Sequence, residues 1–115
     1  LKVDLSMPKA LGGPGKPGAT NPEQLFAAGY AACFESAIRH VARLKKVAPT
    51  DVTVESEVGL VPAETGFALI VTLRPTVSGL ESSVAEDLVA AAHKVCPYSN
   101  ALRNNVDVKI EMQLK

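Results

Sequence analysis

Aromatic residues are scarce in this chain of 115 residues, which has no Trp, two Tyr and three Phe. Apolar residues nevertheless make up 47% of the sequence, and charged residues make up 21%. This balance excludes an intrinsically disordered chain and is enough for one domain, residues 1–115, with its own core. Because large rings are few, we expect that core to consist mainly of Val, Leu, Ile and Ala, packed closely by small side chains.

The chain also lacks an excess of charge of either sign, since 12 Lys and Arg balance 12 Asp and Glu. A neutral chain offers neither the basic surface of a nucleic-acid-binding protein nor a polybasic patch for a membrane. No apolar run approaches the roughly 20 residues that span a bilayer. Residues 1–13 also lack the basic and apolar segments of a secretory signal. We therefore expect a cytoplasmic protein without nucleic-acid or membrane partners.

Cysteine is rare as well: Cys33 and Cys96 lie far apart in the sequence. They form neither a dense disulfide framework nor a paired Cys-x-x-Cys zinc motif. The two histidines, His40 and His93, lack a matching Cys or Asp spacing, so we expect no metal or other cofactor. The sequence has no Gly-x-Ser-x-Gly, P-loop or Gly-x-Gly-x-x-Gly motif. These absences argue against a hydrolase nucleophile and against a nucleotide phosphate site.

The N-terminal half predicts a short strand, a loop and one long helix. Residues 2–6 alternate apolar and polar side chains, as a strand does, and residues 12–18, GGPGKPG, hold too much Gly and Pro for a regular element. A helix is predicted from Pro22 to about Val47, with Asn21 as its N-cap. The small residues of AAGYAACFESA allow another element to approach closely, so we place this helix centrally.

The second half contains three further strand patterns. Residues 51–61 alternate strictly, and residues 67–74 return after the turn PAETG, so these two strands are expected to pair as an antiparallel hairpin. Residues 106–114, VDVKIEMQL, alternate throughout and are the clearest strand pattern in the chain. Four short strands in all are therefore predicted.

Two helices are predicted between the hairpin and the last strand. Ser83 and Glu86 have the spacing of a capping box, which opens a helix that runs to Val95, and Pro97 starts a short second helix. Because strands and helices segregate rather than alternate, the fold class is α+β, an antiparallel sheet with a long central helix. This thin sheet leaves much apolar surface on the helix, so we expect a homodimer in which the helix packs against a second copy.

The residues around the two cysteines leave the roles of these cysteines open. Cys33 lies in the middle of a helix beside aromatic residues, where a free Cys is most often a small buried hydrophobe. Cys96 precedes Pro97 at the expected start of a helix, where unpaired backbone N–H groups stabilise a thiolate, although the same position suits plain capping. Glu23 is explained by the helix dipole alone, or it orients a cationic partner near a thiolate. The residues alone indicate a small α+β domain with two thiols of unknown relation.

Two segments taken together resemble a known family. TNPEQLFAAGYAACF (residues 20–34) and HKVCPYSNALRNNVDV (residues 93–108) resemble the organic hydroperoxide resistance proteins, the Ohr branch of the wider Ohr/OsmC family. The strand GFALIVTL (residues 66–73) fits as well, so the match covers nearly the whole chain. The Tyr-Ser-Asn that follows Cys-Pro favours the Ohr branch over OsmC proper. The resemblance implies an intertwined homodimer with both active sites at the subunit interface.

The resemblance also implies a thiol peroxidase that reduces organic hydroperoxides, alkyl or fatty-acyl, to alcohols. By motif, Cys33 matches the peroxidatic cysteine, Cys96 the resolving cysteine, and Glu23 the glutamate that helps to hold an active-site arginine. Cys33 would become a sulfenic acid and then condense with Cys96 to a disulfide. An external dithiol would reopen that disulfide, and family members use dihydrolipoyl proteins for this purpose.

The same resemblance gives the apolar surroundings of Cys33 a purpose. Phe26, Tyr30 and Phe34 are expected to help shape an apolar substrate pocket. Such a pocket raises the pKa of a thiol by desolvation, so a cation is needed to restore the thiolate. The family supplies an arginine from an N-terminal hairpin with a Gly-Gly-Arg type motif, which these 115 residues do not contain. We expect that this hairpin is missing from the sequence, and no residue is assigned to the arginine role.

Two other interpretations stay open at this point. The first is an OsmC-type peroxidase that uses a broader range of peroxides. The second is a non-catalytic dimer whose cysteines are structural or sense the redox state. The missing arginine motif keeps the second interpretation open, whereas the paired cysteine motifs favour the peroxidase.

Overall fold

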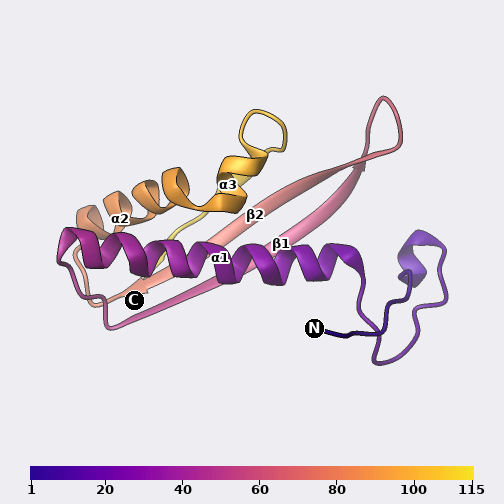
Figure 1. Cartoon of the computed structure of the whole chain (residues 1–115), viewed down its shortest axis with the longest axis horizontal. Helices are drawn as coiled ribbons and strands as arrows, with labels where there is room; N and C mark the ends of the chain where they lie inside the picture. Colours follow the sequence, from indigo (N-terminus) through magenta and orange to yellow (C-terminus); the bar gives the residue numbers. More distant parts are fainter.

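The computed structural model describes residues 1–115, and a long helix lies along a two-stranded hairpin at its centre (Figure 1). In chain order, the elements are the 3₁₀ helix η1 (Lys9–Leu11), α1 (Pro22–Lys45), β1 (Asp51–Pro62), β2 (Phe67–Ser78), α2 (Ser82–Val95), α3 (Pro97–Leu102), β3 (Val108–Ile110) and β4 (Gln113–Leu114). Helix α2 lies alongside α1, and α3 continues from α2 after a bend (Figure 1). The α+β class and the central position of the long helix are thus confirmed. None of the helices is both long and apolar enough to cross a membrane.

Helix α1 begins and ends for local chemical reasons. The side chain of Asn21 accepts a hydrogen bond of 2.8 Å from the backbone N–H of Gln24, and Pro22 occupies the first helical position. At the other end Lys46 adopts a left-handed conformation, with a φ of 57°, which closes the helix close to the predicted end at Val47. The predicted N-cap is therefore confirmed.

The sheet is mixed, so the predicted all-antiparallel sheet is wrong. Strands β1 and β2 form the predicted antiparallel hairpin, in which Asp51 pairs with Ser78 and Pro62 with Phe67. Strands β3 and β4 both pair with β2 in parallel. The physical reason is the connection: the chain leaves the end of β2, passes through α2 and α3, and returns to run in the same direction as β2. Such a crossover delivers a parallel strand, whereas a tight turn delivers an antiparallel one.

The last predicted strand, residues 106–114, is formed as two short pieces. Strand β3 pairs with Val71–Leu73, and β4 pairs with Thr76–Val77 further along β2. Pro75 lies between these two segments of β2 and has no backbone N–H to donate to a neighbouring strand. The interruption therefore originates in β2 and not in the alternating pattern of the last strand.

Two predictions about element starts are also wrong. Residues 2–6 form no strand, because they pair only with the chain near Thr20, through a single parallel bridge from Leu5. Helix α2 begins at Ser82, with the extended residue Glu81 as its N-cap and no capping hydrogen bond from a side chain. Ser83 thus lies inside the first turn, and the predicted capping box is not formed. The backbone leaves the sheet at Gly79, whose left-handed φ of 82° sets the earlier helix start.

The core lies where α1 and α2 meet the hairpin. It is built mainly from Val, Leu, Ile and Ala, as predicted, but two of the aromatic residues, Tyr30 and Phe34, are fully buried within it. Ile38 of α1, Leu73 of β2 and Leu88 of α2 are also completely inaccessible to solvent. This packing fixes α2 against α1 and thereby places the joint between α2 and α3. The expected homodimer stays a prediction.

Replacing Leu88 with Ala is expected to lower the free energy of unfolding by about 2–5 kcal/mol, because the truncation leaves a cavity in the core. Leu44→Ala removes the same atoms from a side chain that is 69% exposed. That control should change the free energy of unfolding by no more than about 0.5 kcal/mol. Urea unfolding followed by circular dichroism measures both values. Equal losses in the two variants would contradict the packing of α2 on α1.

Candidate active site

The fold brings Cys33 and Cys96 together, although 63 residues separate them in the sequence. Their Sγ atoms lie 3.3 Å apart, and both cysteines are free thiols. Cys33 belongs to α1 and is partly buried, whereas Cys96 is fully buried at the joint between α2 and α3. A modest movement separates this contact from the bonding distance of about 2.05 Å in a disulfide. The two thiols, whose relation the local sequence left open, therefore form one site.

Pro97 is the residue that turns Cys96 toward α1. A proline disfavours helical backbone in the residue before it, and Cys96 accordingly has an extended conformation with φ −62° and ψ 123°. Cys96 ends α2 through the bond from its N–H to the carbonyl of Ala92, 2.8 Å long. Its own carbonyl accepts the N–H of Asn100 at 2.9 Å and so opens α3. Cys96 is thus held by hydrogen bonds on both sides of the bend.

Burial is the main influence on the Cys33 thiol, and it raises the pKa of that thiol above the ordinary value of 9.0. The backbone N–H of Tyr98, in the first turn of α3, donates a hydrogen bond to Cys33 and lowers the pKa, whereas the contact with Cys96 raises it again. This N–H group of α3 therefore acts on Cys33, and the side chain of Cys96 makes no capping hydrogen bond in α3. The net effect leaves Cys33 protonated at neutral pH unless a positive charge joins the site.

A cavity of about 470 Å³ opens beside Cys33. Besides Cys33 it is lined by Ser36, Ala37, His40, Val95 and Pro97. The cavity gives an external molecule access to this sulfur, whereas the sulfur of Cys96 lies behind it and is closed to solvent.

The three aromatic residues expected to shape a substrate pocket do not line this cavity. Tyr30 and Phe34 have no exposed surface and belong to the core, so in this chain they form packed walls behind the cysteines. Phe26 is partly buried, and its ring lies 6.0 Å from that of Tyr98, centroid to centroid. Tyr98 is 40% exposed and extends the aromatic group toward the surface. A role in shaping an apolar substrate pocket stays a prediction for all three aromatic residues.

A buried chain of hydrogen bonds lies next to the sulfurs, and the sequence did not predict it. The hydroxyl of Tyr30 lies 2.6 Å from the Ser99 hydroxyl oxygen, which in turn lies 2.9 Å from Nδ1 of His93. Burial raises the pKa of Tyr30, and burial together with the nearby Arg103 lowers the pKa of His93. A signal existed in the sequence: Tyr30 and His93 each lie one helical turn before a cysteine, and Ser99 lies one turn after Cys96.

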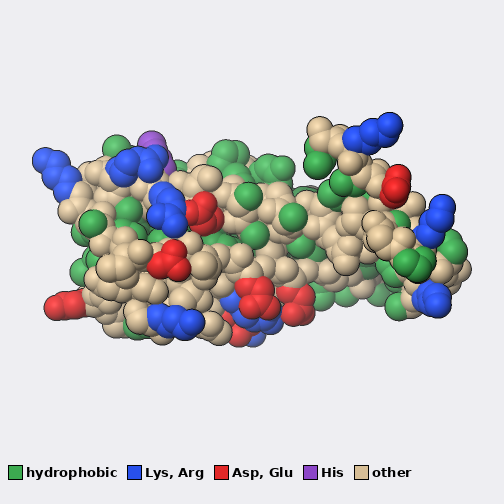
Figure 2. Space-filling view, turned by 90° about the horizontal axis from the view of Figure 1, so that it is seen from below, with side chains coloured by type: hydrophobic (Ala, Val, Ile, Leu, Met, Phe, Trp, Pro, Cys, Tyr) green, Lys and Arg blue, Asp and Glu red, His purple; other side chains and the backbone are tan.

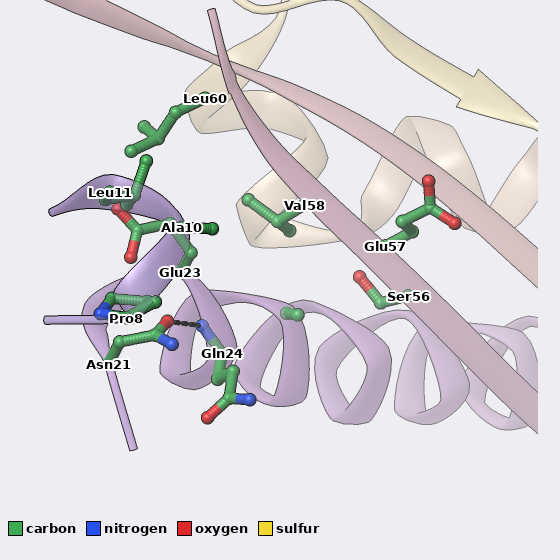
Figure 3. A pocket seen from close by; sticks show the side chains of 11 residues that line it. Pro8, Ala10, Leu11, Asn21, Glu23, Gln24, Ser56, Glu57, Val58 and Leu60 are labelled. Carbon is green, nitrogen blue, oxygen red and sulfur yellow. Dashed lines mark hydrogen bonds between the residues drawn. The ribbon is translucent and has the colours of Figure 1, made fainter. Parts of the chain in front are cut away.

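Glu23 does not meet Cys33 within the chain. It lies in the first turn of α1, and the helical rise places it about 15 Å before Cys33 along the axis. Figure 3 shows its carboxylate beside Leu11 and Leu60, in a cavity of about 410 Å³ between the N-terminal segment, α1 and β1. The hydroxyl of Ser56, which also lines this cavity, is buried without a hydrogen-bond partner. The structure therefore joins Cys33 with Cys96 but leaves Glu23 apart from both.

Mild oxidation of the reduced chain is expected to join Cys33 and Cys96 within one molecule. Because the new bond closes a long loop, oxidation should raise the free energy of unfolding by about 4 kcal/mol. Mass spectrometry of non-reduced peptides identifies the bond, and urea unfolding of the oxidised and reduced forms measures its effect. Cys33→Ser should show no such shift on oxidation. Disulfide-linked dimers as the main product would contradict the placement of the two sulfurs.

Comparison with known proteins agrees with this geometry. The family model described as OsmC-like protein matches residues 13–111. An organic hydroperoxide resistance protein of Xanthomonas axonopodis pv. citri is 49% identical over 113 residues, which cover 97% of this chain and 79% of that protein. The organic hydroperoxide resistance protein OhrB of Bacillus subtilis is 48% identical over 115 residues, covering 98% of this chain and 82% of that protein.

Solved structures show the same relation. The crystal structure of an organic hydroperoxide resistance protein OsmC from Legionella pneumophila has a TM-score of 0.93 at 61% identity, covering 98% of this chain and 82% of that chain. An organic hydroperoxide resistance protein from Elizabethkingia anophelis has a TM-score of 0.95 at 42% identity, covering 100% of this chain and 82% of that one. The chain therefore belongs to the OsmC-like family, in its organic hydroperoxide resistance branch.

Proposed function

We propose that this protein is a cytoplasmic, cysteine-based thiol peroxidase that reduces organic hydroperoxides to alcohols. Membership of a family whose relatives are named organic hydroperoxide resistance proteins supports a role in peroxide defence. The observation that carries the mechanism is the 3.3 Å contact between the sulfurs of two free thiols. The sulfur of Cys33 is open to a cavity, whereas the sulfur of Cys96 is closed to solvent. This difference supports Cys33 as the attacking cysteine and Cys96 as the resolving cysteine.

Cys33 is the attacking cysteine in this proposal. Its thiolate attacks the distal oxygen of ROOH, the O–O bond breaks, and the sulfur leaves the step as a sulfenic acid. The alkoxide takes up a proton and departs as the alcohol ROH. The cavity beside Cys33 supports this assignment, because a hydroperoxide can reach Cys33 but not Cys96.

Cys96 is the resolving cysteine. Its sulfur attacks the Cys33 sulfenic sulfur, the S–S bond forms, and the hydroxyl group leaves with the Cys96 proton as water. The sulfurs already lie at the distance of a near-attack arrangement, so little reorganisation is needed. A dithiol, which we take to be a lipoyl-type protein, then reduces the Cys33–Cys96 disulfide and is itself oxidised to a disulfide.

The attack requires a thiolate, and the environment of Cys33 works against one. Because burial raises the pKa of Cys33, a cation must enter the site to favour the charged form. In our proposal the cation beside Cys33 is held at the subunit interface by Glu23 of the second copy in the homodimer, and Glu23 does not touch the sulfur. The separation of about 15 Å between Glu23 and Cys33 along α1 is too long for direct contact.

A homodimer is part of the same proposal. Large apolar side chains are exposed where the N-terminal segment meets the turn end of the hairpin, among them Leu5, Met7, Leu11 and Phe67, which are 56%, 57%, 48% and 73% exposed. Figure 2 shows hydrophobic side chains at the surface of this end of the molecule, on the right, between scattered charges. Clustered exposed apolar residues of this kind mark an interaction surface, and a second copy of the chain is the partner that we propose.

The contact between the two free thiols also suits a second candidate function, a non-catalytic dimer whose cysteines respond to the redox state. In this case the thiols form the same disulfide with a general oxidant, without catalytic turnover of a hydroperoxide. Steady-state turnover separates the two candidates.

The two cysteines are expected to behave differently when each is replaced. With cumene hydroperoxide and dihydrolipoamide, Cys33→Ser should abolish turnover, because no other thiol can reach the substrate. Without the reductant, Cys96→Ser should consume one equivalent of hydroperoxide per chain to form the Cys33 sulfenic acid, and a second equivalent only where that acid is oxidised further to the sulfinic acid. Peroxide consumption and intact mass measure both effects. Absence of turnover in the unaltered protein would support the redox-responsive dimer instead.

Organic hydroperoxides are expected to be reduced faster than hydrogen peroxide. Each methylene group that the substrate buries contributes about 0.8 kcal/mol, so the preference in kcat/KM should reach about tenfold or more. Assays with cumene hydroperoxide and hydrogen peroxide under the same reductant measure the ratio. Comparable values would indicate an OsmC-type peroxidase with broader peroxide use.

A further inference from the structure

Two contacts join α1 and α3 side by side. The first is the Cys33–Cys96 sulfur contact of 3.3 Å, and the second is the Tyr30–Ser99 hydroxyl contact of 2.6 Å. Tyr30 lies one helical turn before Cys33, and Ser99 lies one turn after Cys96, so the two contacts are adjacent. Tyr30 is 0% exposed and Ser99 is 1% exposed, so solvent does not compete for the hydroxyl pair. The position of Cys96 relative to Cys33 is therefore fixed next to the reacting atoms.

His93 connects α2 to the hydroxyl of Ser99, where α1 and α3 already meet. Its Nδ1 atom lies 2.9 Å from the Ser99 hydroxyl oxygen, and its backbone carbonyl accepts a 2.6 Å hydrogen bond from the guanidinium of Arg103. Because His93 belongs to α2 and Ser99 to α3, their bond spans the bend that contains Cys96. The hydroxyl of Ser99 is thus where all three helices are tied together.

We propose that Tyr30, Ser99 and His93 form a positioning clamp, which holds Cys96 against Cys33 while their disulfide forms and is complete only when His93 is neutral. None of the three residues exchanges a proton or an electron with the sulfurs in this proposal. The clamp acts by limiting the freedom of Cys96, which raises the effective concentration of one thiol at the other. The contribution of the clamp to catalysis rests on the function proposed above, but its effect on the formation of the Cys33–Cys96 disulfide does not.

The direction of the hydrogen bonds follows from counting donors and acceptors. The buried hydroxyl of Tyr30 has Ser99 as its hydrogen-bond partner and so donates to it. Ser99 then donates its own hydrogen to Nδ1 of His93, which must be unprotonated to accept it. If His93 is protonated at both nitrogens, Nδ1–H donates to Ser99 instead. One of the two hydroxyl hydrogens is then left without an acceptor among these groups, a state that buried polar groups avoid.

The charges that face His93 come from several elements. Arg103, beyond α3, and Lys94, on α2, are basic, while Glu86 on α2 and Asp107 before β3 are acidic, and all four line the cavities on either side of the histidine. Burial and then Arg103 lower the pKa of His93 from its ordinary value of 6.5. The clamp is therefore complete above about pH 6.5 and is lost as the pH falls through the lowered pKa.

The clamp decides between two fates of oxidised Cys33. The sulfenic acid either condenses with Cys96, releasing water, or reacts with a second ROOH, which yields a sulfinic acid and ROH. The first reaction is intramolecular, so its rate depends on how tightly Cys96 is held, whereas the second depends on the concentration of peroxide. Loss of the clamp therefore favours the sulfinic acid without slowing the initial oxidation of Cys33.

The decisive measurement is the equilibrium between the Cys33–Cys96 pair and a dithiothreitol redox buffer, which needs no hydroperoxide. Ser99→Ala and Tyr30→Phe are expected to lower the equilibrium constant for the disulfide by about fivefold, the effect of one buried hydrogen bond. Ser83→Ala, an exposed serine on α2, serves as the matched control and should leave it unchanged. Tyr30→Phe keeps the buried ring, so it remains informative if Ser99→Ala folds poorly. If Ser99→Ala and Tyr30→Phe both have the same equilibrium constant as the unaltered protein, the proposal is overturned.

The role of His93 is tested by pH. As the pH falls below about 6.5, the equilibrium constant of the parent should fall by up to about fivefold once His93 becomes protonated. His93→Asn places an acceptor oxygen near the position of Nδ1 but cannot take up a proton in this range, so its constant should match that of the parent at pH 7 and stay level. The requirement for a neutral histidine would be overturned by either of two results. The equilibrium constant of the unaltered protein would not change with pH, or the constant of His93→Asn would fall in parallel with it.

A second readout follows the reaction with cumene hydroperoxide. In Ser99→Ala, the ratio of Cys33 sulfinic acid to disulfide should rise about fivefold by intact mass, while the rate of Cys33 oxidation stays within about twofold of the parent. A variant that slows oxidation and resolution equally would indicate a merely structural role. If the parent Cys33 does not react with the hydroperoxide at all, the proposed peroxidase function fails, and the redox-buffer equilibrium still decides the clamp.

Discussion

The bend at Cys96–Pro97 is the constraint on which the site depends. Proline disfavours helical backbone in the residue before it, so Cys96 is extended and the chain divides there into α2 and α3. The bend carries Cys96 out of the helical path and against α1, where its sulfur meets that of Cys33. It also aims the backbone N–H of Tyr98 at Cys33. Pro97 thus sets the position of the Cys96 thiol and part of the electrostatic environment of the Cys33 thiol.

The site shows the cost of placing thiols in an apolar core. Burial closes Cys96 to solvent, and it raises the pKa of the partly buried Cys33 and so disfavours the thiolate form. One N–H group from α3 offsets this effect only in part. The polar groups that remain in the core are instead joined to one another, in the chain from Tyr30 through Ser99 to His93. Polar atoms so deeply buried persist because each finds a partner.

Local patterns predicted most of the elements, since local physics governs them. The Asn21 cap, the Pro22 start and the break at Pro97 each depend on a few neighbouring residues, and each appears in the structure. The strand errors share a different origin. Residues 106–114 alternate well, yet their pairing is interrupted because Pro75 lies opposite the gap, on another strand. Residues 2–6 alternate too but have only a single bridge to pair with. A strand exists only where a partner offers hydrogen bonds, and no local pattern records the partner.

The sequence by itself determined the α+β class, the long central helix, the hairpin and, through two motifs, the family. It also singled out the two cysteines whose sulfurs meet in the structure, although the residues around each cysteine did not indicate the other. Only the tertiary structure decided that their sulfurs lie 3.3 Å apart, that a backbone N–H at the start of α3 acts on Cys33, and that Tyr30 and Phe34 are fully buried in the core. The reason is physical. Periodicity and capping act over one or two turns of chain, whereas a contact across 63 residues depends on how whole helices pack around a shared core.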